Sequence, residues 1–205
     1  MDNNYLYELK GTLYLNITNR CGNRCEFCIR SNSDALVGYD MRLQKEPTFA
    51  DMKNALDAYA KPFAEAVFCG YGEPTYNFDT LVQTGAYLRS LGKKVRLNTN
   101  GQAKLIHPAR DVVRELAESV DEVSVSLNEA DRGAYQNLCH PKFGMFTHDE
   151  ILDFARECKE AGLKVRFTVV DIIPNESIRR CRKIASQMGV PLVVRRHVSD
   201  NENYT

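Results

Sequence analysis

Hydrophobic and polar positions along the chain follow a helix-then-strand order that repeats several times. The clearest junctions are Leu91-Gly92, Ala161-Gly162 and Met188-Gly189, where an amphipathic stretch ends in glycine and an apolar run follows. A glycine at a helix end supplies the left-handed cap, and a short apolar run is typical of a buried strand. The pattern predicts strands near 12–18, 65–69, 94–98, 121–127, 164–170 and 191–196. It predicts helices near 48–60, 79–91, 108–118, 148–161 and 176–188.

Some of these helices carry start signals, and Asn175 after Pro174 marks one of them. Thr48 follows Pro47 directly before an amphipathic stretch, and Thr147-x-x-Glu150 has the spacing of a capping box. We therefore expect Thr48 and Thr147 to cap the helices that follow them.

Strands that alternate with helices predict a parallel sheet with helical crossovers. Right-handed crossovers curl six such units into part of a barrel. The predicted fold class is therefore α/β, a partial (β/α)6 barrel with mainly parallel strands, in one domain spanning 1–205. Six strands cannot close as eight do, so one side stays open or is covered. Three segments could cover it. Tyr5–Leu9 can be turned back against the first strand by Lys10-Gly11, and Arg30–Pro47 is expected to fold over the mouth. The third is the polar tail Ser199–Thr205.

Three cysteines, Cys21, Cys25 and Cys28, follow directly on the first predicted strand. Three thiolates so close together can wrap one face of a metal centre, and the local spacing offers no fourth ligand. A metal centre with an open position is where chemistry takes place. The alternative is a zinc-stabilised, non-catalytic binding module that takes Cys69, Cys139 or a histidine as its fourth ligand.

Polar residues follow the other predicted strands at the points where they end. They are Gly70-Tyr71-Gly72-Glu73, Asn98-Thr99, Ser126 with Asn128, and Arg195. Ser126 and Asn128 alternate with apolar neighbours, so we expect both to point to one face of their strand. Because ligand sites in such folds lie at the carboxyl ends of the strands, these residues are expected to converge on one mouth.

The C-x₃-C-x₂-C spacing, with Phe27 before the last cysteine, resembles the radical S-adenosylmethionine (radical SAM) superfamily. The resemblance implies that the three cysteines hold three irons of a [4Fe–4S] cluster, whose fourth iron SAM chelates. It also implies a set of SAM contacts: Gly70, Tyr71, Gly72 and Glu73 for the amino group, Asn98 and Thr99 for the methionine part, Ser126 and Asn128 for the ribose, and Phe27 and Arg195 for adenine. Tyr71 departs from the family pattern, because many members have glycine there.

The resemblance further implies a radical enzyme. A one-electron donor such as a flavodoxin or ferredoxin reduces the cluster, and SAM is cleaved to a 5′-deoxyadenosyl radical that abstracts hydrogen from an unidentified substrate. The open side of the barrel favours a large substrate. Nearly the whole chain also resembles a small radical SAM subgroup associated with TatD-type nucleases. For Cys139 two interpretations stay open, an inert packed thiol or a residue that acts on the substrate.

Composition adds limits to this interpretation. The 205 residues are 43% apolar and 26% charged, which is ordinary for a globular domain. Lysine and arginine balance aspartate and glutamate, so overall charge gives no reason to expect nucleic-acid binding. The start lacks a signal-peptide pattern, no apolar run is long enough for a membrane helix, and seven cysteines indicate reduced thiols or metal ligands. The expected location is the cytoplasm.

Overall fold

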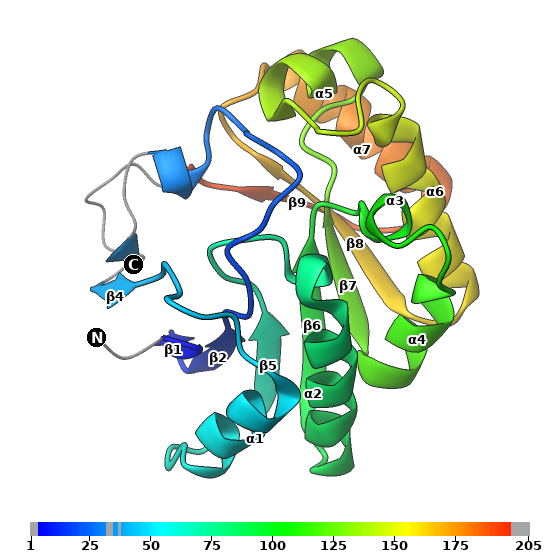
Figure 1. Cartoon of the computed structure of the whole chain (residues 1–205). Coiled ribbons are helices and arrows are strands. Elements are labelled where there is room, and N and C mark those ends of the chain that lie inside the picture. The colour runs from blue at the N-terminus through cyan, green and yellow to red at the C-terminus, as the bar shows by residue number, and fades with distance from the viewer. Residues whose placement is uncertain (1–3, 32–34, 37, 198–205) are drawn as a thin grey trace.

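The computed structural model describes residues 4–31, 35–36 and 38–197. A seven-stranded sheet forms its centre, in the order β1-β2-β5-β6-β7-β8-β9 (Figure 1). The strands are β1 (Leu6–Leu9), β2 (Thr12–Leu15), β5 (Glu65–Phe68), β6 (Lys94–Thr99), β7 (Glu122–Ser126), β8 (Lys164–Val170) and β9 (Leu192–Arg195). β1 pairs antiparallel with β2, and every other neighbouring pair is parallel. The predicted α/β fold with an open, partial barrel is confirmed.

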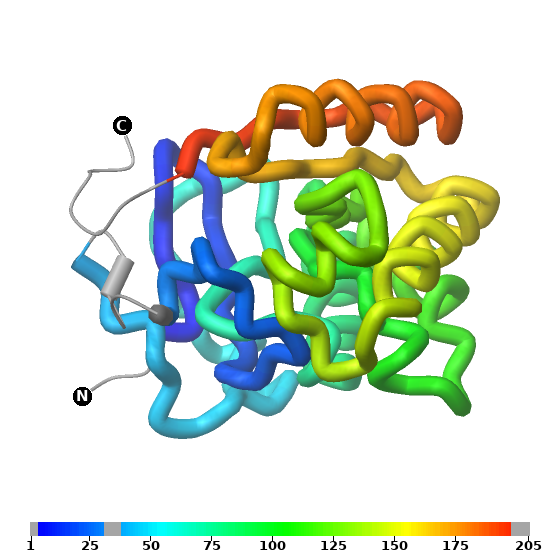
Figure 2. The backbone as a smooth tube through the Cα atoms, turned by 90° about the horizontal axis from the view of Figure 1, so that it is seen from above, coloured from blue at the N-terminus to red at the C-terminus, as the bar shows by residue number. Residues whose placement is uncertain are grey.

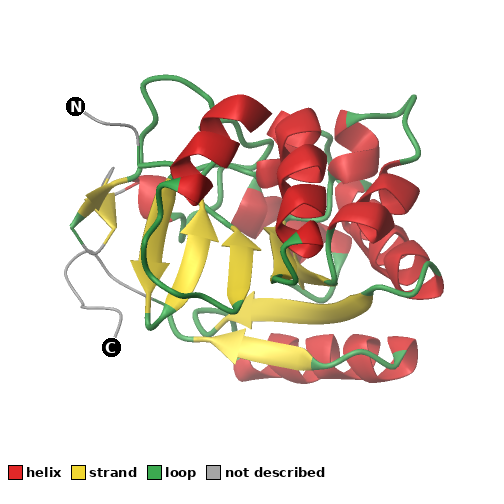
Figure 3. Cartoon of the chain, turned by 90° about the horizontal axis from the view of Figure 1, so that it is seen from below, coloured by secondary structure: helices red, strands yellow, loops and turns green. Residues whose placement is uncertain are grey.

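Most of the larger helices lie on the outer side of the curved sheet, as the view from below shows (Figure 3). They are α1 (Phe49–Asp57), α2 (Phe78–Ser90), α4 (Val112–Ser119), α5 (Arg132–Cys139), α6 (Thr147–Glu160) and α7 (Asn175–Met188). The short elements are η1 (Ile29–Ser31), η2 (Pro74–Asn77), α3 (Ala103–Ile106) and a hairpin of β3 (Ala35–Leu36) and β4 (Tyr39–Asp40). Among the described residues, no helix is both long and apolar enough to cross a membrane.

Alternation along the strands separates the hydrophobic core from the functional face. In β6, Val95 and Leu97 are fully buried in the core cluster with helix residues such as Leu88. Arg96 and Asn98, on the other face of the same strand, line a cavity on the inner side of the sheet. The sheet therefore buries its apolar residues under the helices and presents polar residues to the inside of the open barrel.

The N-terminal hairpin covers one edge of the barrel as predicted. Leu9 pairs with Thr12, and Lys10 and Gly11 make the turn with φ of 50° and 75°. Glycine reaches positive φ without strain, which makes the tight reversal possible. β9 is the opposite edge of the sheet.

The start of α6 differs from its prediction. Phe146 occupies the N-cap without a side-chain cap, and the Thr147 hydroxyl donates to the Gly144 carbonyl at 2.6 Å. The predicted capping box is wrong because Thr147 already lies in the first turn. The Thr48 prediction is confirmed, since its hydroxyl accepts from the Asp51 backbone N–H at 3.2 Å and its own N–H donates to the Asp51 carboxylate at 2.9 Å. α5 was not predicted.

Within the described part of Arg30–Pro47 only Arg30 lines the cavity described below, and the rest of that part does not form the expected cover. Asn16 Nδ2 donates to the Met41 carbonyl at 2.7 Å, and Asn19 Nδ2 donates to the Leu43 carbonyl at 2.7 Å. These bonds hold residues 38–47 along the loop that leaves β2, and none of them lines the cavity described below. Residues 32–34, residue 37 and the predicted polar tail lie outside the described residues.

Candidate active site

A cavity of about 350 Å³ lies at the carboxyl ends of the strands, on the inner face of the sheet. It is lined by every residue that the sequence singled out as a metal or cofactor contact: Cys21, Cys25, Phe27, Cys28, Gly70, Tyr71, Gly72, Glu73, Asn98, Thr99, Ser126, Asn128 and Arg195. Their convergence follows from topology, because parallel strands deliver their following loops to one end of the sheet. The roles assigned to them stay predictions.

The cysteine loop is held in place by α5 and the segment that follows it. Arg24 N–H donates to the Cys139 carbonyl at 3.0 Å, and Glu26 N–H donates to the Leu138 carbonyl at 3.1 Å. Carbonyls in the last turn of a helix have no partner within that helix. At the end of α5, two such carbonyls bind the N–H groups of the residues on either side of Cys25. Lys142 N–H adds a bond of 2.7 Å to the Gly22 carbonyl. Seen from above, the blue cysteine loop lies beside the yellow-green chain between α5 and α6 (Figure 2).

The three thiols are partly buried, and this controls their protonation. Burial raises the pKa of Cys21 to about 12, and burial also raises the pKa of Cys28. The pKa of Cys25 is raised first by a hydrogen bond with the Cys139 side chain and then by burial. Protein surroundings alone therefore favour three neutral thiols, and the positive charge of bound metal is needed to deprotonate them.

Amide groups of two asparagines approach the cysteine sulfurs. Asn23 N–H lies 3.5 Å from Cys21 Sγ, and Asn100 Nδ2 lies 4.0 Å from the same atom. The Asn23 side chain also hydrogen-bonds to Cys25 and is oriented by Gln102, whose Nε2 donates to Asn23 Oδ1 at 2.6 Å. Donors of this kind stabilise thiolates and tune a metal–thiolate centre. Asn23 was not among the predicted site residues, although it stands between two of the cysteines.

The donor set fits an iron–sulfur cluster. Among the described residues, no three histidine, cysteine, aspartate or glutamate side chains gather tightly enough to hold one metal ion. A cubane cluster does not need such convergence, because each cysteine binds a different iron. The three cysteines line the cavity together with the amide donors Asn23 and Asn100.

Glu73 is the most deeply buried acid at the site, with 4% of its surface exposed. One carboxylate oxygen accepts from Thr75 N–H at 3.2 Å, Thr75 Oγ1 at 2.8 Å and Thr99 Oγ1 at 2.7 Å, and the other accepts from Asn100 N–H at 2.6 Å. Burial raises the pKa of this carboxyl, and these hydrogen bonds oppose the rise. Among the described residues Glu73 has no cationic side-chain partner, so it is a hydrogen-bonded negative charge suited to a cationic ligand.

The glycines before Glu73 permit a close approach of two loops. A Cβ on Gly70 would lie 2.2 Å from Asn16 Oδ1, and one on Gly72 would lie 2.4 Å from the Arg20 carbonyl. Gly72 N–H donates to the Thr18 carbonyl at 2.9 Å. These glycines therefore bring the β5 loop against the chain that leads into the cysteines. Tyr71 carries the Arg30 guanidinium over its ring at 4.9 Å, a cation–π contact at the cavity wall.

Asn128 reaches the cavity by a different route from the one predicted. β7 ends at Ser126, and Asn128 has a left-handed backbone with φ of 60°. Simple strand alternation with Ser126 was therefore wrong, although both residues line the cavity. Asn128 Nδ2 donates to Cys139 Sγ at 3.4 Å, while its buried Oδ1 has no hydrogen-bond partner among the described residues. An unpartnered buried acceptor beside a cavity is suited to a ligand hydroxyl.

The floor of the cavity is charged. Arg166 pairs with Glu122 at 2.5 Å, and Arg96 pairs with Glu65 at 3.4 Å. Arg96 also donates to Asn98 Oδ1 at 3.0 Å and so orients one of the predicted SAM contacts. Arg96 and Arg166 were missed, yet alternation along β6 and β8 places both on the same face as the polar strand ends.

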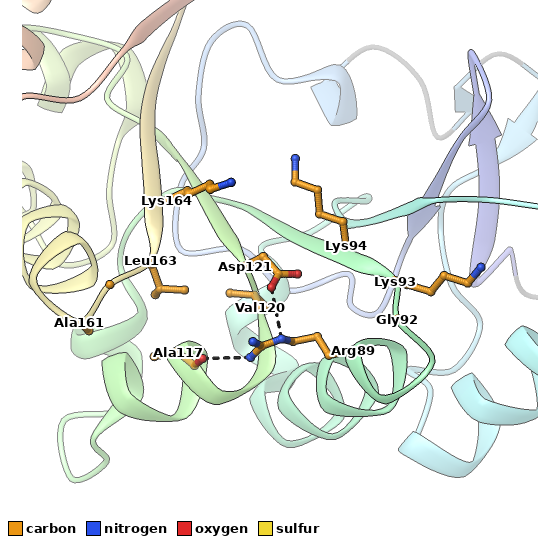
Figure 4. Close-up of a pocket in the computed structure, with 11 residues that line it drawn as sticks. Arg89, Gly92, Lys93, Lys94, Ala117, Val120, Asp121, Ala161, Leu163 and Lys164 are labelled. Carbon is orange, nitrogen blue, oxygen red and sulfur yellow. Dashed lines mark hydrogen bonds and ion pairs between the residues drawn. The ribbon is translucent and has the colours of Figure 1, made fainter.

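A larger cavity, of about 640 Å³, opens at the amino ends of β6, β7 and β8 (Figure 4). Arg89 crosses its base, with an ion pair of 3.3 Å to Asp121 and a hydrogen bond of 3.1 Å to the Ala117 carbonyl. Lys93, Lys94 and Lys164 stand around it. None of the three cysteines, nor Glu73, lines this cavity. The smaller cavity at the carboxyl ends is therefore the candidate active site.

Fold and site together define an α/β partial barrel in which three cysteines and several polar side chains line one cavity at the carboxyl ends of the strands. The model of the radical SAM superfamily matches residues 15–188, and the chain belongs to this superfamily. A separate comparison with curated proteins finds no match to the chain.

Solved structures share the fold. SuiB of Streptococcus suis, bound to S-adenosylmethionine, has a TM-score of 0.71 at 21% identity over 91% of this chain and 42% of its own. The methylornithine synthase PylB has a TM-score of 0.64 at 15% identity, covering 91% of this chain and 53% of its own. TsrM of Kitasatospora setae, with cobalamin and a [4Fe–4S] cluster, has a TM-score of 0.57 at 13% identity, covering 90% and 36%. The chain thus spans about half or less of each of these proteins.

Proposed function

We propose that the protein is a radical SAM enzyme that holds a [4Fe–4S] cluster through Cys21, Cys25 and Cys28. One observation carries the proposal: the three cysteines line the same cavity as the buried carboxylate of Glu73, which has no cationic side-chain partner among the described residues. Membership of the superfamily and the ligands named for SuiB and TsrM support it. When the cluster and SAM are bound, they supply one-electron cleavage of SAM to a 5′-deoxyadenosyl radical that abstracts hydrogen from the substrate.

The residues around the cavity take separate roles in this proposal. Glu73 faces the ammonium group of SAM, with Gly70, Tyr71 and Gly72 beside it. Asn98 and Thr99 face the methionine part, and Ser126 and Asn128 face the ribose. Phe27 and Arg195 face adenine.

The protein around these contacts fixes them before the ligand arrives. Thr99 is held by Glu73 at 2.7 Å, and Asn98 is held by Arg96 at 3.0 Å. A site whose polar groups are already oriented loses less entropy when it binds.

The substrate is proposed to enter at the open side and to be sizeable. At about 350 Å³ the cavity is at the lower end of small-molecule pockets, so SAM takes most of it and the substrate lies at its rim. That rim is bounded by the edge strand β9, where Val193 is 39% exposed. The electron donor is proposed to be a flavodoxin- or ferredoxin-type protein. The TatD-associated subgroup and the cytoplasmic location stay predictions.

The test is anaerobic reconstitution with iron and sulfide, followed by reduction in the presence of SAM. We expect about four irons per chain, a reduced-cluster EPR signal that SAM perturbs, and formation of 5′-deoxyadenosine and methionine. A colourless protein that binds one zinc and no SAM would refute the proposal and favour the non-catalytic zinc module. Deuterium transfer into 5′-deoxyadenosine from a panel of labelled substrates would then identify the substrate class.

A further inference from the structure

Cys139 is the last residue of α5, and its side chain is fully buried at 0% exposure. Its sulfur accepts a hydrogen bond from Asn128 Nδ2 at 3.4 Å and is hydrogen-bonded to the Cys25 side chain. It is not among the residues that line the cavity. Its position therefore lies behind the site, between a predicted iron ligand and a predicted SAM contact, and does not suit a residue that acts directly on substrate.

Metal binding would give these hydrogen bonds a direction. A cysteine that binds iron is a thiolate and has no proton to donate. The bond between the two sulfurs must then run from Cys139 S–H to Cys25 Sγ, which leaves the lone pairs of Cys139 to accept from Asn128 Nδ2. With Nδ2 committed in this way, Asn128 presents Oδ1 as its remaining acceptor, and this buried atom has no hydrogen-bond partner in the described part of the chain.

The backbone keeps the arrangement rigid. The Cys139 carbonyl accepts from Arg24 N–H at 3.0 Å, directly beside Cys25 in the chain. Asn128 has a left-handed φ of 60°, and its N–H lies 3.3 Å from the Thr168 carbonyl. A short chain of hydrogen bonds between fixed backbones transmits a change at one end to the other.

We propose that Cys139 is a positioning residue that joins the cluster ligand Cys25 to the SAM contact Asn128 by two hydrogen bonds. In the first, Asn128 Nδ2–H donates to Cys139 Sγ, and in the second, Cys139 S–H donates to Cys25 Sγ. The inference rests on the proposed function and adds a residue that the superfamily motif does not contain. A hydrogen bond to a ligating thiolate stabilises the reduced cluster, because reduction adds negative charge that the donor partly neutralises. The same residue holds Asn128 ready for a ligand hydroxyl.

Three variants test this, each reconstituted as the full chain beside the wild type. Cys139→Ala removes both hydrogen bonds, Cys139→Ser keeps a donor and an acceptor, and Cys158→Ala is the matched control. Cys158 is also fully buried in a helix but lies in α6, outside the cavity lining. The readouts are the cluster's midpoint potential, from an EPR-monitored redox titration, and the Kd for SAM.

For Cys139→Ala we expect a more negative midpoint potential and SAM binding weakened about fivefold, the loss of one ordinary hydrogen bond. Cys139→Ser is expected to return both values toward the wild type, and Cys158→Ala to change neither. Wild-type potential and Kd in Cys139→Ala would overturn the inference. If that variant fails to assemble a cluster, the serine variant decides: restoration of both values supports the inference, and a loaded serine variant that restores neither overturns it. A wild-type protein without a cluster would instead refute the proposed function.

Discussion

Replacing Glu73 by glutamine tests whether its buried carboxylate is the counter-charge for the ammonium group of SAM. Glutamine keeps the volume and one oxygen but removes the charge. The retained oxygen fits best where Thr75 and Thr99 donate three hydrogen bonds. The new NH₂ group then faces Asn100 N–H, which now donates to carboxylate at 2.6 Å.

Two effects on stability oppose each other in the ligand-free protein. Loss of the Asn100 bond to a charged acceptor costs about 1.5–3 kcal/mol. Removal of a charge whose burial raises its pKa recovers part of that cost. We expect a net destabilisation of about 1 kcal/mol for Glu73→Gln, measured by chemical unfolding, and a larger loss for Glu73→Ala, which leaves all the donors unpaired.

The effect on SAM is expected to be larger and separate from the cluster. Loss of a hydrogen bond from an ammonium to a carboxylate weakens binding by about 1–3 kcal/mol, or roughly 5- to 150-fold. Anaerobic titration calorimetry of the reconstituted variant measures this, and iron and sulfide contents should equal those of the wild type.

Glu129→Gln is the matched control for Glu73→Gln. Glu129 is 5% exposed and accepts from Ala130 N–H at 3.0 Å, but it does not line the cavity. Wild-type SAM affinity in Glu73→Gln, or equal weakening in both variants, would refute the assignment of Glu73 to the ligand.

Three further predictions concern the cluster, the loop contact and pH. Single replacement of Cys21, Cys25 or Cys28 by alanine should abolish the visible absorbance of the reconstituted protein, whereas Cys158→Ala should keep it; full iron and sulfide in all three single variants would contradict their role. Gly72→Ala places a Cβ 2.4 Å from the Arg20 carbonyl, so it should lower the free energy of unfolding by about 2 kcal/mol or more. Gly133→Ala, in α5 with its nearest neighbour at 3.7 Å, should be neutral or stabilising, and equal effects of the two would show that the close approach is unimportant. Finally, the raised pKa of Glu73 makes the folded protein hold its proton above pH 4.5, where the unfolded chain has lost it. The stability that this bound proton contributes is lost as pH rises from about 4.5 through the folded pKa. The free energy of unfolding of the wild type, relative to that of Glu73→Gln, should therefore decrease over that range in urea titrations. A constant difference between the two proteins would contradict the raised pKa.

Local sequence signals were sufficient for most of the fold. Gly92, Gly162 and Gly189 occupy left-handed positions, with φ of 71°, 87° and 62°, at the helix ends where the pattern predicted them. The apolar runs after them form β6, β8 and β9. These signals succeed because a cap and the strand after it involve neighbouring residues, whose pattern the sequence displays directly.

The missed features depend on contacts between distant segments. α5 has a weak apolar pattern, with Tyr135 and Cys139 as its buried residues, so periodicity did not reveal it. Its importance lies in backbone bonds to Arg24 and Glu26, which leave no mark on side-chain chemistry. Asn128 similarly reaches the cavity through a left-handed turn that strand alternation does not predict.

The position of α5 gives the cysteine loop a support that the motif itself lacks. Three cysteines within eight residues lie on a loop with few backbone hydrogen bonds of its own. One of them runs from Cys28 N–H to the Cys25 carbonyl at 3.1 Å. Two carbonyls at the end of α5 accept from Arg24 and Glu26 N–H, and the Gly22 carbonyl accepts from Lys142 N–H. These bonds tie the cysteine loop to the segment after β7. Asn128 lies in the same segment, between β7 and α5. Since one segment both supports the cysteines and supplies a cavity residue, a displacement of α5 would alter the cluster ligands and the SAM pocket together.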